Sequence, residues 1–140
     1  MAKLLFFIIA VSALLLSACT GVTSLNKTAE TENSYRVISV EQLKTMMENK
    51  DFLLVNVHIP YAGEIEGTDL FLPYNEIEHN LDKLPADKNA RIVAYCRSGM
   101  MSKTAAKTLV SLGYTEVIDV TGGMIAWENA GYQLIEKPAR

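Results

Sequence analysis

Residues 91–112 read RIVAYCRSGMMSKTAAKTLVSL. The first five residues, 91–95, form a short apolar run, which predicts a central β-strand. Residues 102–112 form the next predicted element, a helix that ends at Gly113. Its apolar residues recur at helical spacing and share one face: Ala105, Ala106, Leu109 and Leu112. This stretch therefore predicts a strand, a tight loop and a helix in succession.

The same alternation extends to both sides of this stretch. Further strands are predicted at residues 35–38, 52–57 and 117–120, and further helices after Ser39, at 75–84 and at 124–129. Ser39 and Gln42 have the spacing of a capping box at a helix start. Residues 59–73 contain two prolines and two glycines and are predicted to be mostly loop. Alternating strands and helices predict an α/β fold with a mostly parallel central sheet flanked by helices.

This arrangement makes Cys96 a candidate functional residue, because it directly follows the strand at 91–95. Ligands of open α/β sheets bind at the carboxyl ends of strands. A helix N-terminus offers unpaired N–H groups and a partial positive charge, which favour an anion and a thiolate. Gly99 supplies backbone freedom for the tight loop, and Arg97 brings a cation close to a bound anion. The sequence therefore predicts a reactive cysteine in an anion-binding loop.

Three segments resemble the rhodanese family. The first is residues 96–103, a strand-end Cys followed by a short loop and a helix. The second, Leu-Val-Asn-Val-His at 54–58, resembles the family's Asp-Val-Arg segment. The third, residues 119–127, resembles the family's closing Gly-Gly turn and Trp. The likeness runs from about Val37 to Tyr132, which implies a rhodanese-like three-layer fold.

The resemblance also implies a chemistry for Cys96. As the catalytic nucleophile, its thiolate takes the outer sulfur of a donor such as thiosulfate and forms a persulfide, which a thiophilic acceptor removes. The loop residues are expected to bind the sulfur-containing anion or persulfide through their backbone amides: Arg97, Ser98, Gly99, Met100, Met101 and Ser102. The acceptor is a thiol or another thiophile, including a protein, and neither a metal nor an organic cofactor is expected.

Some positions depart from the family pattern. Asn56 stands where Asp is common, and His58 stands where Arg is common. The usual Gly-His-Ile-x-Gly-Ala segment appears as Gly-Glu-Ile-Glu-Gly-Thr at residues 63–68. If Glu64 and Glu66 faced the site, their negative charges would disfavour an anionic donor.

The N-terminus predicts export. Lys3 precedes an apolar run at residues 4–16 that is shorter than the roughly 20 residues of a membrane-spanning helix. The following Leu-Ser-Ala-Cys resembles a bacterial lipobox, which implies a lipoprotein signal peptide at 1–18 and a lipid on Cys19. Residues 19–34 are then a flexible tether, residues 35–140 form the domain, and the lipid holds the protein on a membrane, facing the periplasm.

Charge and cysteine content narrow the functions further. The net charge is −3, so no basic surplus indicates a nucleic-acid partner. The chain has two cysteines. If Cys19 carries lipid, Cys96 has no disulfide partner, and an odd Cys in an exported protein indicates reactivity.

Three other functions also use a cysteine-containing loop or the same fold. A cysteine-based phosphatase or arsenate reductase uses Cys, five residues and then Arg, but here that position is Ser102. A thioredoxin-like protein needs a Cys-x-x-Cys pair, which this sequence lacks. A persulfide carrier or partner-binding rhodanese module stays open as the alternative, with little turnover of thiosulfate.

Overall fold

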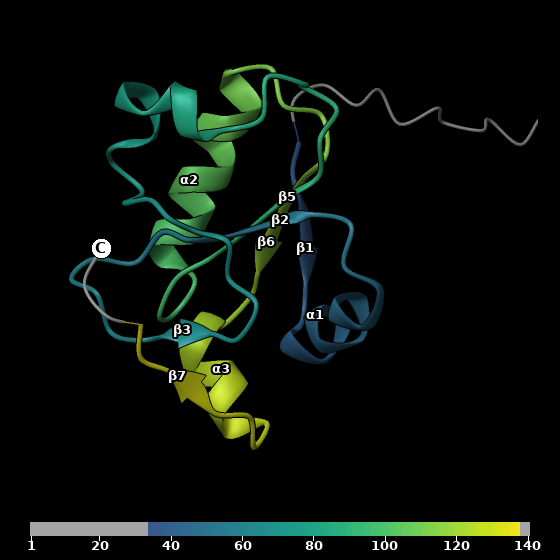
Figure 1. Ribbon diagram of the computed structural model, residues 1–140, viewed down its shortest axis with the longest axis vertical. Helices are drawn as coiled ribbons and strands as arrows, with labels where there is room; N and C mark the ends of the chain where they lie inside the picture. Colours follow the sequence, from purple (N-terminus) through teal and green to yellow (C-terminus); the bar gives the residue numbers. More distant parts are fainter. Residues whose placement is uncertain (1–33, 138–140) are drawn as a thin grey trace, which may run out of the picture. The chain divides into compact units, whose positions relative to one another are not determined.

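The computed structural model describes residues 34–137, and Figure 1 shows how the elements of this part are arranged. The predicted signal peptide, the lipid site at Cys19 and all but the last residue of the tether lie outside the described residues. The elements are, in order, β1 Arg36–Ile38, α1 Val40–Met46, η1 Met47–Asn49, β2 Leu53–Asn56, β3 Glu64–Ile65, β4 Leu70–Phe71, η2 Ile77–His79, η3 Leu81–Lys83, β5 Ile92–Tyr95, α2 Met100–Ser111, β6 Val117–Val120, α3 Gly123–Asn129 and β7 Leu134–Ile135. None of the helices within residues 34–137 is both long and apolar enough to span a membrane.

Five strands form a sheet with the order β1-β6-β5-β2-β4, and every pairing in it is parallel. Its central strand, β5, is buried at all four positions, as expected for a strand covered on both faces. Asn56 of β2 pairs with Tyr95 of β5, and Ala94 of β5 pairs with Asp119 of β6. The carboxyl ends of these three strands therefore meet at one edge of the sheet, and Cys96 lies at its centre.

Two hydrophobic layers enclose the sheet. Alternate strand residues such as Val55 and Ala94 pack with α2, and their neighbours Leu54 and Tyr95 pack with α1 and α3. Figure 1 shows α2 and α1 on opposite sides of the strands. The predicted three-layer α/β fold is confirmed.

The start of α1 follows its sequence closely. Ser39 Oγ accepts a hydrogen bond from Gln42 N at 3.3 Å, and Gln42 Oε1 accepts one from Ser39 N at 2.9 Å. This is the predicted capping box, in which the two side chains satisfy two otherwise free N–H groups.

Replacing Ser39 with alanine should therefore lower the free energy of unfolding by about 1 kcal/mol, the usual cost of losing an N-cap side chain. Urea denaturation would measure the loss. Ser111→Ala, an exposed substitution at the end of α2, serves as the control and should change stability little. Equal effects of the two substitutions would contradict a capping role.

Three features differ from the predicted elements. The single helix predicted at 75–84 was wrong, because this segment forms the two short 3₁₀ turns η2 and η3, separated at Asn80, whose φ and ψ are −132° and 41°. Only Ile77 of these turns is buried, so little apolar packing supports a longer helix. Helix α2 begins at Met100 rather than at Ser102. The two-residue strands β3, β4 and β7 were not predicted, β3 and β4 within the expected loop, because strands of two residues carry no readable periodicity.

Candidate active site

The sulfur of Cys96 is enclosed by the loop that leads into α2. Gly99 N–H donates to Cys96 Sγ at 3.0 Å, and the thiol donates to Ser102 Oγ at 3.6 Å. The residue is only 1% exposed. Gly99 is the N-cap of α2 with a φ of +100°, a conformation that favours glycine. The backbone turn at Gly99 therefore places an amide and the helix N-terminus against the sulfur.

The Gly-Gly turn that starts α3 packs against the loop that follows Cys96. Met124 N–H donates to Cys96 O at 2.9 Å, and Ile125 N–H donates to Arg97 O at 3.0 Å. A Cβ added at Gly123 would lie 1.9 Å from Cys96 O. This close approach links the third segment of the sequence resemblance to the cysteine loop.

The six predicted binding residues divide into two groups. Gly99 and Ser102 are buried and contact the sulfur: among the described residues, Gly99 N–H donates to Sγ and Ser102 Oγ accepts from it. Arg97, Ser98 and Met100 are exposed, with Met100 at 74%. Met101 is half-buried and packs on the core that α2 shares with the sheet. The loop thus presents a polar inner side and a mixed outer rim.

Asp119 is a buried residue that the sequence interpretation did not single out. It lies in β6, is 0% exposed, and neither carboxylate oxygen has a hydrogen-bond partner of normal geometry in residues 34–137. Burial raises the pKa of this carboxyl, while the nearby Ser102 hydroxyl and the Lys103 ammonium oppose the rise. A lone charged residue within the apolar Val-Ile-Asp-Val strand was the signal that could have identified it.

Asp119→Asn should alter the pH dependence of stability. The folded pKa is raised above the unfolded value of about 3.9, so the stabilising contribution of the bound proton is complete below about pH 4. That contribution is lost as the pH rises through the folded pKa, because the folded state must then bury a charge. The variant should therefore gain stability relative to the wild type as the pH rises.

Urea denaturation at a series of pH values would measure this difference in the free energy of unfolding. Asp82→Asn, at an exposed position, is the matched control and should show a much smaller pH-dependent difference. A difference between Asp119→Asn and the wild type that does not vary with pH would contradict the prediction.

The departure at Asn56 has a structural explanation. Asn56 is fully buried, its Nδ2 donates to Gly63 O at 3.0 Å, and its Oδ1 accepts from His58 N–H at 3.0 Å. An ionised aspartate could not make the first of these bonds, because it has no donor. Burial, and to a lesser extent the charge of Arg97, lowers the pKa of His58.

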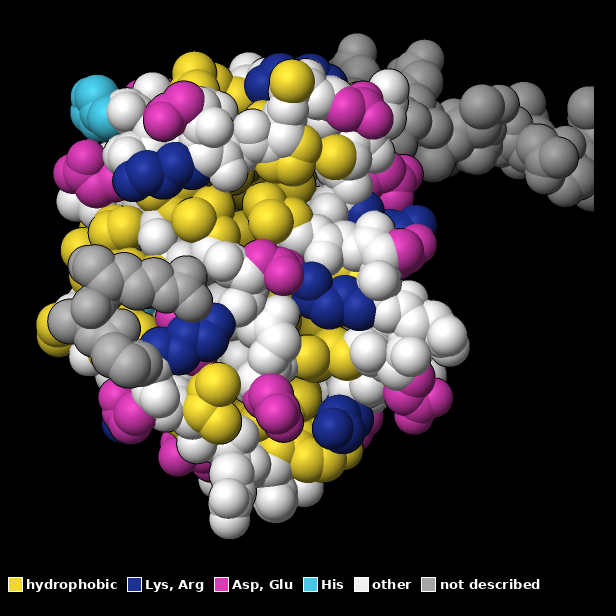
Figure 2. All heavy atoms as spheres, viewed as in Figure 1, with side chains coloured by type: hydrophobic (Ala, Val, Ile, Leu, Met, Phe, Trp, Pro, Cys, Tyr) yellow, Lys and Arg dark blue, Asp and Glu magenta, His cyan; other side chains and the backbone are white. Residues whose placement is uncertain are grey.

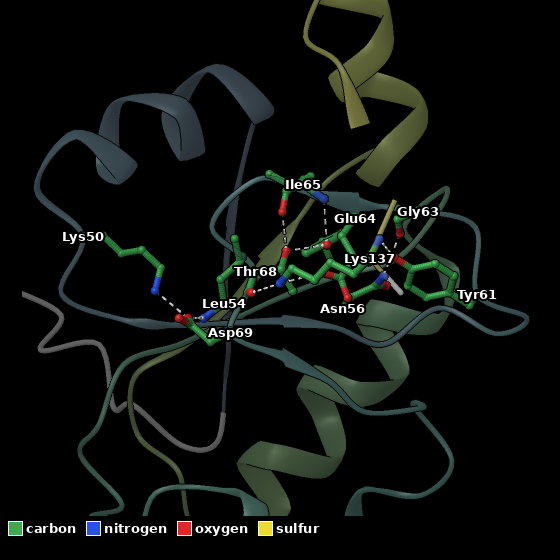
Figure 3. Close-up of polar contacts among 11 residues, drawn as sticks. Lys50, Leu54, Asn56, Tyr61, Gly63, Glu64, Ile65, Thr68, Asp69 and Lys137 are labelled. Carbon is green, nitrogen blue, oxygen red and sulfur yellow. Dashed lines mark hydrogen bonds and ion pairs between the residues drawn. The ribbon is translucent and has the colours of Figure 1, made fainter. Parts of the chain in front are cut away.

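The two glutamates of residues 63–68 lie in different environments. Glu64 is 2% exposed, and its Oε2 lies 2.8 Å from Lys137 Nζ. Figure 3 shows Lys137 reaching into a polar cluster with Glu64, Thr68 and Tyr61. Glu66 is exposed and lines a separate groove beside α1, with Lys44 and Lys50. The negative charge of Glu64 is therefore balanced inside the protein.

The outer surface mixes charge with apolar side chains. On the face drawn in Figure 2, acidic and basic side chains are interspersed, and hydrophobic side chains gather in the upper half, where α2 lies.

Comparisons with known proteins agree with this geometry. The family described as Rhodanese-like domain matches residues 39–130. A sulfurtransferase of Allochromatium vinosum is 33% identical over 92 residues, which cover 64% of this chain and 84% of that protein. The thiosulfate sulfurtransferase GlpE of Pseudoalteromonas translucida is 27% identical over 107 residues, covering 74% and 99%.

A solved structure shows the same fold. The rhodanese-related protein of Thermoplasma volcanium superposes with a TM-score of 0.63 at 24% identity. The match covers 74% of this chain and all of that one.

Proposed function

Because this chain belongs to the rhodanese-like domain family, we propose that it moves sulfane sulfur from a donor such as thiosulfate to a thiophilic acceptor through a persulfide on Cys96. One observation carries the proposal. The Cys96 sulfur accepts a hydrogen bond from Gly99 N–H at 3.0 Å, at the N-terminus of the 12-residue helix α2. This position stabilises a negative charge on sulfur, both in the thiolate and in the persulfide.

The chemistry consists of two nucleophilic attacks on a sulfur atom. The Cys96 thiolate attacks the outer sulfur of thiosulfate and forms a new S–S bond. The bond between the two donor sulfurs breaks, and its electron pair leaves with sulfite. A thiophilic acceptor then attacks the outer sulfur of the persulfide, and the electron pair of that bond returns to Cys96 as thiolate.

The charge near the loop suits an anionic donor. Arg97 is exposed within the loop itself, and Lys103 is exposed on the first turns of α2. Of the two glutamates at residues 63–68, Glu64 is buried and paired with Lys137, and Glu66 is exposed and lines the separate groove beside α1. Two exposed cations therefore lie on or beside the loop, and the charge of Glu64 is balanced by Lys137.

Intact-mass spectrometry of residues 34–140 tests the proposal. Incubation with thiosulfate should add one sulfur, about 32 Da for the persulfide step, and cyanide should remove it. Cys96→Ser should show no gain, with unchanged far-UV circular dichroism as the fold control. No gain by a folded wild-type domain with a reduced thiol would reject thiosulfate as donor.

A persulfide carrier that receives sulfur from a protein is the second candidate, and the apolar rim of the loop favours it. Met100 is 74% exposed, and Ile125, whose N–H bonds to Arg97 O, is 40% exposed. Apolar side chains beside a buried sulfur suit contact with another protein surface. Loading by a protein persulfide but not by thiosulfate would support this candidate over the first.

We also propose that the chain is exported and lipid-anchored through Cys19, on the strength of the lipobox-like Leu-Ser-Ala-Cys. Expression of the full chain in a bacterium with labelled palmitate should label the wild type and not Cys19→Ala. A wild-type protein that takes up no label would reject the anchor.

A further inference from the structure

We propose that the outer face of α2 and the loop before it form a docking surface for a protein whose reactive thiol is flanked by acidic side chains. This proposal rests on the proposed function, because it names the kind of protein that takes the sulfur from Cys96. It deepens that function by assigning residues beyond the loop to the choice of partner. The docking surface consists of Arg97, Met100, Lys103, Lys107 and Ile125.

Positive charge is concentrated in one segment of an acidic chain. Residues 88–115 contain five Lys and Arg residues and no Asp or Glu, although the chain as a whole has a net charge of −3. Two of these five cations make contacts elsewhere. Arg91 is paired with Asp51 at 2.7 Å, and the Lys88 ammonium lies over the ring of Tyr114. The docking surface holds the other three: Arg97, Lys103 and Lys107.

The three cations of the docking surface are exposed and have no ion-pair partner within residues 34–137. The turn η2, which packs beside α2, carries the exposed acids Glu76 and Glu78. Of these, Glu76 lies 3.8 Å from His79 of the same turn. An exposed cation without a partner attracts negative charge over about 8 Å at physiological salt. The charge of this surface therefore favours an acidic partner.

The cations extend along α2 beyond the reach of a small anion at the cysteine. Met100, Lys103 and Lys107 are spaced by three and four residues, so they share one face of the helix. At a rise of about 1.5 Å per residue, Met100 and Lys107 are about 10 Å apart along the helix axis. A donor of the size of thiosulfate at Cys96 cannot contact this whole length, whereas a protein surface can.

Two exposed apolar side chains lie beside the cysteine loop. Met100, which is 74% exposed, directly follows Gly99, whose N–H donates to Cys96 Sγ at 3.0 Å. Ile125 is 40% exposed, and its N–H donates to Arg97 O at 3.0 Å. Met and Arg are enriched in interfaces between proteins. Apolar side chains next to cations therefore suit a protein partner, which charge selects and apolar contact holds.

The transfer at this surface is an exchange between thiols. The partner's thiolate attacks the outer sulfur of the Cys96 persulfide and forms a new S–S bond. The bond between that sulfur and Cys96 breaks, and its electron pair returns to Cys96 as thiolate. The partner leaves with the persulfide. Docking must therefore bring the partner's thiol to the loop, and the cations of α2 orient the acidic side chains around that thiol.

The test compares sulfur transfer from loaded Cys96 to two synthetic cysteine peptides, one with glutamates and one with lysines on both sides of the cysteine. Each rate is divided by the rate with 2-mercaptoethanol, a small neutral thiol. For the acidic peptide, Lys107→Glu should lower this ratio roughly tenfold at low salt, as expected for lost electrostatic steering, and for the basic peptide it should raise the ratio. Both effects should disappear at about 1 M salt, where charges are screened within about 3 Å.

Lys44→Glu is the matched control, because it changes the net charge equally on α1, on the opposite side of the sheet from α2 (Figure 1). It should leave both ratios close to those of the wild type. Ratios that Lys107→Glu does not change would overturn the proposal. Binding to phosphatidylglycerol vesicles that Lys107→Glu abolishes, with unchanged peptide ratios, would also overturn it and assign this surface to a membrane.

A second measurement separates this proposal from the proposed function. The same peptides, activated as 2-pyridyl disulfides, form a mixed disulfide with the Cys96 thiolate and release pyridine-2-thione. This reaction needs no persulfide, and Lys107→Glu should slow it for the acidic peptide by a similar factor relative to dipyridyl disulfide. Such charge dependence without sulfur loading from any donor would keep the docking surface and reject sulfur transfer. Sulfur loading without charge dependence in either measurement would do the reverse.

Discussion

Gly123→Ala should destabilise the domain by about 4 kcal/mol or more and largely prevent loading of Cys96, an effect in the upper range for single substitutions. The new Cβ would lie 1.9 Å from Cys96 O and 2.8 Å from its carbonyl carbon. These are backbone atoms, so no side-chain rotation relieves the contact. The turn must move away from the loop, which breaks the hydrogen bonds from Met124 and Ile125 to the cysteine loop. Urea denaturation and intact mass after thiosulfate would measure the two effects.

Gly113→Ala is the matched control for this substitution. Gly113 also has a positive φ, +91°, but nothing lies within 4 Å of an added Cβ. It should lose only about 1 to 2 kcal/mol, the cost of a left-handed conformation for a residue with a side chain, and should still load sulfur. Equal losses at the two glycines would show that backbone conformation, rather than contact with Cys96, explains the need for Gly123.

Lys137→Met should lower the free energy of unfolding by about 3 kcal/mol, because it leaves Glu64 buried without its cation. Glu64 is 2% exposed, and Lys137 Nζ lies 2.8 Å from its Oε2. The same ammonium donates to Thr68 O at 2.6 Å, a bond that the methionine also removes. Figure 3 shows the lysine beside both partners. Urea denaturation at neutral pH would measure the loss.

Two further variants test the cause of that loss. The double variant Glu64→Gln, Lys137→Met should recover a large part of the stability, since the glutamine carries no charge to leave unpaired. Lys107→Met, on the exposed side of α2, should change stability by no more than about 0.5 kcal/mol. A double variant as unstable as Lys137→Met alone would assign the loss to the contact with Thr68 and to packing.

The position of Cys96 could be predicted from the sequence because its determinants are local. The apolar strand, Gly99 and the helix that follows are contiguous in the chain, and their periodicity and turn chemistry predict a thiol at a strand end beside a helix N-terminus. The capping box of Ser39 and Gln42 was predictable for the same reason. The Gly-Gly turn was identified by resemblance, but its direct contact with Cys96 O could be measured only in the structure.

The sequence by itself therefore determined the α/β class, the strand-loop-helix around Cys96 and the family. Only the tertiary structure decided that Glu64 is paired with Lys137, from a segment about 70 residues later, and that Asp119 lies buried near Ser102. The physical reason is the range of the interactions. Periodicity and capping act over a few residues, whereas the environment of a charge depends on which strands become neighbours. Strand order and register bring such groups together, and neither can be read from one strand alone.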